Sequence, residues 1–131
     1  MYKRRLFREV FKLNGLRESF KFAIRGIVYL FLFHRNMRII FLLGILALLL
    51  GFYFQLRGIE LMILSVTIAL VFMAEILNTT IELILDIFFD RYHPKVKIIK
   101  DISAAVVVIT VLNSLAIGYI LFVRKLIYFW K

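Results

Sequence analysis

The chain contains no cysteine, a single proline and only 8 acidic residues against 18 basic ones. The missing cysteines exclude a disulfide framework and leave the redox compartment open. With one proline, no Ser/Gly-rich linker, no internal repeat and no low-complexity segment, the sequence predicts a single domain over residues 1–131. It also lacks a GxxxxGK[ST] motif and a GxGxxG after a strand, which excludes a soluble nucleotide-binding fold.

Apolar residues are what the chain has in excess. They make up 63% of its 131 residues, at a mean hydropathy of +0.94, whereas roughly half would be apolar in a soluble domain. The composition therefore predicts an integral membrane protein. A formal net charge of +10 is typical of nucleic-acid-binding proteins, but here the basic residues stand beside membrane-length apolar segments. Anionic lipid headgroups are the expected partner, and nucleic acid is not.

Three apolar segments, 39–56, 61–89 and 102–123, are long enough to cross a bilayer, which takes about 20 predominantly apolar residues. The short sequence QLRGIE (Gln55–Glu60) is expected to make a tight turn between the first two. A connection that holds the only proline joins the second to the third. The predicted fold class is an all-α membrane protein with three transmembrane helices.

Residues 1–33 precede these spans, and their basic and apolar side chains recur at helical spacing. This pattern predicts an amphipathic helix that lies in the membrane surface, with its last part, IVYLFLF, reaching deeper. A disordered basic tail is the alternative. Because no short apolar core ends in a small-residue cleavage site, the segment is not expected to be a removable signal peptide.

The basic residues also predict the orientation. Ten lie between Lys3 and Arg38 and four between Arg91 and Lys100, against one, Arg57, in the first turn. Since basic residues gather in cytoplasmic loops, the N-terminus and the second connection should be cytoplasmic and the C-terminus outside. An interfacial anchor is expected at the C-terminus from its basic and aromatic residues: Arg124, Lys125, Tyr128, Phe129, Trp130 and Lys131.

The second span carries polar residues where a bilayer would penalise them. In AEILNTTIELILD (74–86) they recur at i, i+3, i+4, i+7 and i+11, along one helical face: Glu75, Asn78, Thr79, Glu82 and Asp86. Charged groups inside a membrane helix usually mark ion, proton or substrate sites, so this face should meet protein or water. The alternative is that the polar residues only join helices by hydrogen bonds. Asn78, Thr79 and Thr80 suit that role, but a pair of glutamates is costly for it.

The two glutamates lie at different depths. The segment 61–89 is about 43 Å long, and a hydrocarbon core measures roughly 30 Å. Counted from Leu61, Glu75 lies about 21 Å in and Glu82 about 32 Å in, near the cytoplasmic boundary. A desolvated carboxylate can act as a base toward a lipid headgroup, whereas one at the water boundary stays ionised and can hold a divalent cation. Lys100 and Asp101 add a cation and a carboxylate at the depth of Glu82, and such a mixture is what phosphoryl transfer uses.

The sequence EILNTTIELILD (75–86), followed by HPKVKIIKD (93–101) and a pair of alanines, resembles the prokaryotic diacylglycerol kinase and undecaprenol kinase family of small membrane enzymes. Further similar segments are SFKFAIRG, RNMRI and AIG, so the resemblance covers about residues 19–122. HP at 93–94 and RNMR at 35–38 are more similar to the undecaprenol kinase branch.

The resemblance implies an active site between the protomers of a homotrimer, at the cytoplasmic surface of a bacterial inner (plasma) membrane. MgATP is the implied donor and a lipid alcohol the implied acceptor. Glu75 corresponds to the catalytic base, Glu82 to a glutamate that binds the metal and the nucleotide, and Asn78 to a residue that positions the substrate. The other nucleotide contacts that the resemblance implies are Arg91, Tyr92, His93, Lys100 and Asp101.

His34 departs from the family's pattern, because the family carries a second metal-binding glutamate immediately before RNMRI. Neutral imidazole is a poor Mg²⁺ ligand, and the replacement removes a negative charge from the site. Mg²⁺ can still be held by one or two carboxylates plus substrate phosphates, so Glu82 and the ATP oxygens would suffice. His34 is expected to be solvated and not to serve as a dedicated ligand.

Three functions remain open on the sequence. The first is a lipid kinase that phosphorylates undecaprenol or diacylglycerol with ATP. The second is a catalytically weak or silent relative that acts as a membrane scaffold or lipid-binding protein, which His34 favours. The third is an ion or proton carrier, in which Lys100, Asp101 and the basic connection have no obvious place. The homotrimer follows from the resemblance and not from the periodicity.

Overall fold

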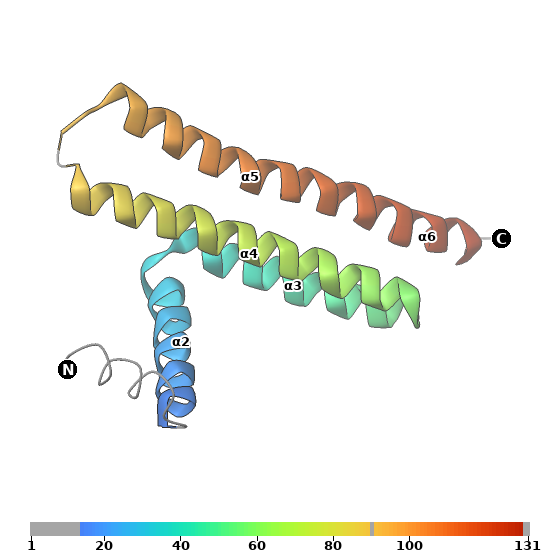
Figure 1. Ribbon diagram of the computed structural model, residues 1–131. Helices are drawn as coiled ribbons and strands as arrows, with labels where there is room; N and C mark the ends of the chain where they lie inside the picture. Colours follow the sequence, from blue (N-terminus) through green and yellow to red (C-terminus); the bar gives the residue numbers. More distant parts are fainter. Residues whose placement is uncertain (1–13, 90, 130–131) are drawn as a thin grey trace. The chain divides into compact units, whose positions relative to one another are not determined.

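The computed structural model describes residues 14–89 and 91–129, and all regular structure in these ranges is helical (Figure 1). The chain divides into two compact units, residues 1–35 and 36–131. This boundary falls next to the one expected between the surface helix and the first span. The basic residues before Asn14, and also Trp130 and Lys131, lie outside the described residues.

Helix α2 (Asn14–Phe33) is the described part of the first unit. Its basic residues Arg17, Lys21 and Arg25 recur every four positions and share one face, while apolar residues such as Leu16 and Ile27 lie on the opposite side. Most of its side chains are exposed, including large apolar ones. An exposed apolar stripe beside a basic one is the pattern of a helix that lies in a membrane surface.

Helix α3 (Arg35–Tyr53) begins the second unit and returns through a tight turn into α4 (Ile59–Phe88). In the turn, Gln55 and Gly58 have positive φ angles of 55° and 54°, and the main-chain N–H of buried Leu56 donates to the carbonyl of Gly51 at 2.8 Å. The predicted turn at 55–60 thus lies where the chain reverses.

Side chains of α4 pack against two glycines of α3. A Cβ atom at Gly44 would lie 3.2 Å from Ile68 Cγ2, and one at Gly51 would lie 2.9 Å from Leu64 Cδ2. Phe41 packs edge-on against Phe72, with ring centroids 6.3 Å apart. The two antiparallel helices therefore meet along their apolar residues.

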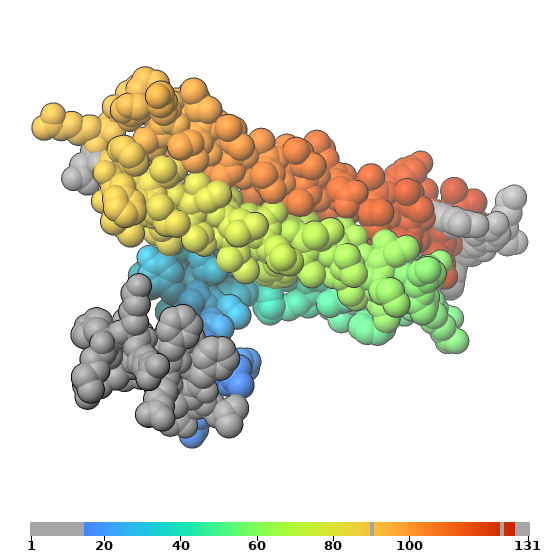
Figure 2. Space-filling view, in the orientation of Figure 1, coloured from blue at the N-terminus to red at the C-terminus, as the bar shows by residue number. Residues whose placement is uncertain are grey.

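The third long helix is capped at its N-terminus by a residue of the connection that precedes it. His93 precedes helix α5 (Pro94–Gly118), and its Nδ1 accepts the main-chain N–H of Lys95 at 3.2 Å. Pro94 occupies the first helical position, where its missing N–H costs nothing. Helix α5 runs back along α4, and the side chains of the two helices are in contact along their length (Figure 2).

A π-helical segment, η1 (Tyr119–Val123), follows α5 and leads into the short helix α6 (Arg124–Phe129). Leu121 of η1 is buried with Leu56 and Leu64, next to the turn between α3 and α4. Lys125 forms an ion pair with Glu60 at 3.0 Å. These contacts hold the beginning of α4 to the end of the third long helix.

Three long apolar stretches of helix are candidate membrane spans among the described residues: Arg35–Tyr53, Ile59–Phe88 and Pro94–Ile127. The all-helical membrane fold is thus confirmed. The helices begin before the apolar segments at 39 and 102, because a helix keeps its backbone hydrogen bonds in the polar turns that lead into the membrane.

Candidate active site

The polar residues of α4 change from buried to exposed along the helix. Glu75, Asn78 and Thr79 are buried, with 4%, 9% and 2% of their surface exposed. Glu82, one turn further on, is half-buried, and Asp86 is exposed. Burial within the protein thus decreases from Glu75 through Glu82 to Asp86, while the predicted depth of each in the membrane stays a prediction.

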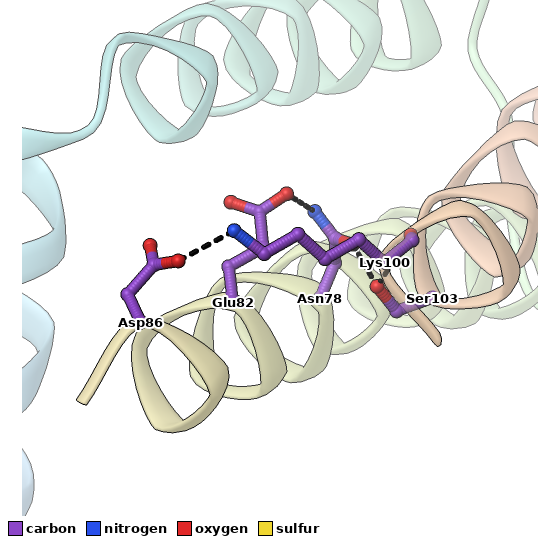
Figure 3. Close-up of polar contacts among 5 residues, drawn as sticks. All are labelled: Asn78, Glu82, Asp86, Lys100 and Ser103. Atoms are coloured by element: carbon purple, nitrogen blue, oxygen red, sulfur yellow. Dashed lines mark hydrogen bonds and ion pairs between the residues drawn. The ribbon is translucent and has the colours of Figure 1, made fainter. Parts of the chain in front are cut away.

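Asn78 connects this face of α4 to α5 (Figure 3). Its Nδ2 donates to Glu82 Oε1 at 3.3 Å, one turn along the same helix. Its Oδ1 accepts from the hydroxyl of Ser103 on α5, at 2.7 Å. The same hydroxyl lies 2.9 Å from the main-chain oxygen of Lys100. Asn78 therefore orients the Glu82 carboxylate and links α4 to α5.

Lys100 brings a positive charge to the same end of the two helices. Its Nζ lies 2.5 Å from Asp86 Oδ1, in a pair whose side chains are 36% and 62% exposed. Figure 3 shows the lysine side chain extending from α5 toward the end of α4. A pair this exposed contributes little to stability, so the ammonium group can exchange Asp86 for another anion at little cost.

Asp101 lies next to Lys100 in sequence, but its side chain pairs with a residue of its own helix. It pairs with Lys97 at 3.6 Å, one turn earlier on α5, and both side chains are mostly exposed. The structure thus places Lys100, and not Asp101, against the acidic residues of α4. The predicted contact between Asp101 and a nucleotide stays a prediction.

Glu75 differs from the other acidic residues. Within the described part of the chain its carboxylate has no hydrogen bond or ion pair, although its side chain is buried. Among the described residues no fully buried side-chain oxygen or nitrogen lacks a hydrogen-bond partner, so the Glu75 carboxylate reaches the surface of the described chain while most of the residue is covered. Glu75 is therefore the most buried carboxylate of this face and is still open to a ligand.

The connection 89–93 contains three further residues with predicted roles. Arg91 and Tyr92 are exposed, and His93 is exposed while it caps α5. The His93 ring also lies near Phe89, with centroids 6.3 Å apart. The structure thus gives His93 a capping role that the sequence reading did not include, and the nucleotide contacts of all three stay predictions.

The carboxylates of this site are too few to hold Mg²⁺ by themselves, but they could hold it together with the phosphate oxygens of a substrate. No group of three or more His, Asp or Glu side chains that could hold a metal occurs among the described residues. Mg²⁺ commonly takes one or two carboxylates and completes its shell with phosphate oxygens and water. Glu82 fits this requirement, because its carboxylate is half-buried, oriented by Asn78 and close to solvent. His34 belongs to the first unit, where its main-chain N–H donates to Leu30 at 2.9 Å.

Ser103 is the residue of this network that the sequence reading missed. It is buried, with 4% exposed, and it is the α5 partner of Asn78. Its position three residues after Lys100 is the one signal in the sequence, because i and i+3 share a helical face. That spacing does not reveal which residue of α4 it meets.

Comparison with known proteins places this site in a family context. Residues 21–122 match the family described as prokaryotic diacylglycerol kinase, and this range includes every side chain of the network. The chain is 36% identical over 115 residues to an undecaprenol kinase of Bacillus subtilis, covering 88% of this chain and 94% of that protein. It is 31% identical over 105 residues to a diacylglycerol kinase of Synechocystis sp., covering 79% of this chain and 60% of that protein.

Proposed function

Because the chain belongs to the prokaryotic diacylglycerol kinase family of lipid kinases, we propose that it transfers the γ-phosphoryl group of ATP to the hydroxyl of undecaprenol. The relative that is covered over 94% of its length is an undecaprenol kinase, and the HP and RNMR segments favour the same acceptor. Diacylglycerol is the alternative acceptor. The reaction takes place at the cytoplasmic surface of the membrane, where the polar end of α4 meets water.

Glu75 is the catalytic base in this proposal. The lipid hydroxyl approaches from the membrane side, and the Glu75 carboxylate takes its proton as the oxygen attacks the γ-phosphorus and ADP leaves. Asn78 lies one turn away and keeps the neighbouring Glu82 carboxylate in place. In-line transfer needs no covalent intermediate, so positioning and charge neutralisation supply most of the catalysis.

Lys100 and Glu82 act on the nucleotide. The ammonium group of Lys100 is held at the site by Asp86 and is accessible enough to turn to a phosphate oxygen. Glu82 would hold Mg²⁺, which when bound neutralises phosphate charge and orients the γ-phosphoryl group. Arg91, Tyr92, His93 and Asp101 are proposed to contact the nucleotide from the connection and from the first turns of α5, where their side chains are exposed.

A homotrimer is part of this proposal, as the family resemblance implies. Support comes from the large apolar surface of the spans, of which only a small share is buried within the described chain. A neighbouring protomer would cover part of that surface and close the polar end of α4. Cross-linking in membranes, followed by mass analysis, tests the trimer directly.

The observation that carries the proposal is a buried glutamate, Glu75, two turns of α4 before the half-buried Glu82 carboxylate, with Lys100 of α5 paired to Asp86 one turn further on. The decisive experiment is phosphorylation of undecaprenol and of diacylglycerol by the purified protein with labelled ATP and Mg²⁺. We expect Glu75→Gln to lower the rate at least 100-fold, because general bases contribute about 10²–10⁴-fold.

The matched control is Glu60→Gln, on the same helix about 22 Å away at 1.5 Å per residue. Glu60 forms a partly exposed ion pair with Lys125, so its loss should leave the rate nearly unchanged. Equal rates for wild type and Glu75→Gln would contradict the role of Glu75. A wild-type protein that phosphorylates no acceptor with Mg²⁺ or Mn²⁺ would favour the scaffold that His34 suggests, and proton uptake by vesicles without ATP would favour the carrier.

A further inference from the structure

An apolar cavity of about 280 Å³ lies between α3, α4 and α5. Along α4 it lies before Glu75, whereas the polar end of this helix, with Glu82 and Asp86, lies after Glu75. Its walls include Gly44 and Ala47 of α3, Val71 of α4, and Ser114 and Gly118 of α5. All of these residues belong to the second unit. The residues of the phosphotransfer site proposed above do not line this cavity, so it has no role in the reaction as described so far.

The lining offers nothing to a polar ligand. Two hydroxyl groups line the cavity, and each donates to a carbonyl of its own helix. Thr67 Oγ1 donates to Ile63 at 2.7 Å, and Ser114 Oγ donates to Val111 at 2.8 Å. No charged residue lines the cavity. Because a buried polar ligand needs partners for its hydrogen bonds, the occupant that suits this cavity is a hydrocarbon chain.

The cavity is aligned with Glu75 along α4. Its lining on this helix runs from Leu64 to Val71, and Val71 precedes Glu75 by one turn, about 6 Å. A hydrocarbon chain that lies along the cavity therefore has one end within a turn of the buried carboxylate. Its other end points toward the turn between α3 and α4, away from the polar end of α4.

The two glycines of the wall differ in the room beside them. At Gly44 there is little room for a side chain, because an added Cβ would lie 3.2 Å from Ile68 Cγ2. At Gly118 an added Cβ meets no atom of the described residues within 4 Å, and the π-helical segment begins at the next residue. Gly118 is thus a position in the wall where a larger side chain has room to enter.

We propose that this cavity binds one hydrocarbon chain of the lipid substrate and so helps to select the lipid alcohol that Glu75 deprotonates. The inference rests on the proposed function. The volume lies just below the roughly 300–1,000 Å³ typical of ligand pockets, so the cavity holds the part of one chain nearest the hydroxyl. The rest of the lipid lies among bilayer chains.

The test fills the cavity from α5, at two positions one turn apart, with the separate variants Gly118→Leu and Ser114→Leu. The matched control is Ala116→Leu, an exposed position of α5 that does not line the cavity. Phosphorylation of undecaprenol is compared with that of a single-isoprene alcohol, which is too short to depend on the cavity. We expect the two cavity variants to lower kcat/KM for undecaprenol at least tenfold and to leave the short alcohol and the KM for ATP unchanged.

Other results would overturn the inference. Unchanged kcat/KM for undecaprenol in both cavity variants would show that no substrate chain binds there. An equal loss for both alcohols would assign the cavity a structural role. Loss of cross-linked oligomers in the cavity variants, with monomers still folded, would show that a helix of a second copy occupies it.

A binding measurement separates this inference from the proposed function. A photoreactive long-chain prenol should label peptides of α4 and α5 in the wild type and in Ala116→Leu, and Gly118→Leu should abolish the labelling. Labelling of a protein that has no kinase activity would support the cavity as a lipid site while the proposed function fails. Absence of labelling in an active protein would overturn the inference alone.

Discussion

The hydroxyl of Ser103 has one proton and two acceptors within reach, Asn78 Oδ1 at 2.7 Å and the main-chain oxygen of Lys100 at 2.9 Å. Donation to Asn78 fixes the amide orientation, because Oδ1 must then face α5 and Nδ2 must face Glu82. The buried Ser103 hydroxyl on α5 thereby helps to fix the orientation of the Glu82 carboxylate on α4. Ser103 acts through Asn78 and is a positioning residue.

Ser103→Ala should reduce kcat about fivefold with the KM for the lipid nearly unchanged, since a hydrogen bond worth about 1 kcal/mol is lost near the reacting groups. Ser103→Thr retains the hydroxyl and should restore most of the rate. Steady-state kinetics of both variants, with thermal unfolding in detergent as control, provides the check. A lower unfolding temperature with an unchanged kcat would reduce Ser103 to a packing role.

His34 offers a gain-of-function test. His34→Glu places a carboxylate at the position where the family resemblance implies one, so we expect faster lipid phosphorylation and a lower Mg²⁺ concentration for half-maximal rate. A Mg²⁺ titration of the rate measures both. The same change in a Glu82→Gln background should give a smaller gain, because one carboxylate would then replace another. Unchanged rates and metal dependence would refute this prediction.

At the scale of the helices, side chains of α4 and of the turn before it pack against Gly51 of α3. A Cβ at Gly51 would lie 2.9 Å from Leu64 and 3.4 Å from Leu56, and both leucines are buried in the core next to the turn. Larger side chains at this position must displace well-packed neighbours. The crowding arises from packing between helices, since Gly51 itself lies within α3 and has no positive φ.

Gly51→Val should therefore lower the free energy of unfolding by about 1–3 kcal/mol, the usual cost of overpacking. Gly118→Val is the matched control, because open space surrounds that position and helix propensity changes in the same direction. Thermal unfolding of both variants in one detergent compares them. Equal midpoints would mean that Leu64 and Leu56 move aside freely and that α3 is not held against α4 by this contact.

At the scale of the whole molecule, the sequence predicts the long helices because bilayer thickness imposes their length. It also predicts the polar face of α4, since spacing within one helix places Glu75, Asn78 and Glu82 together. The family membership inferred from those motifs is confirmed by the match over residues 21–122. These features depend on local sequence or on a property of the solvent.

The contacts between α4 and α5 are not predictable in this way. Their adjacency in sequence suggests one role for Lys100 and Asp101, yet Lys100 pairs with Asp86 and Asp101 pairs with Lys97. Ser103 received no role from its sequence, and the π-helical segment Tyr119–Val123 was read as ordinary helix. Each depends on the register and rotation of one helix against another, which tertiary packing decides and periodicity does not.

The orientation in the membrane is a prediction that the absence of cysteine makes simple to test. Lys95→Cys and Arg57→Cys introduce single thiols at exposed positions at opposite ends of α4 and α5. With a membrane-impermeant maleimide on intact cells, we expect labelling at Arg57→Cys and labelling at Lys95→Cys only after permeabilisation. The reverse pattern would invert the topology and place the polar end of α4 away from cellular ATP.

The network from Asn78 to Ser103 is contained in a single helical hairpin, α4 and α5 with their short connection. Contacts between segments close in sequence form early and rapidly. During biosynthesis, the buried amide and hydroxyl can find each other as soon as the third span enters the bilayer. Insertion of this hairpin and assembly of the polar network are then one event, and a nascent chain that fails to pair Asn78 exposes an unsatisfied amide to lipid.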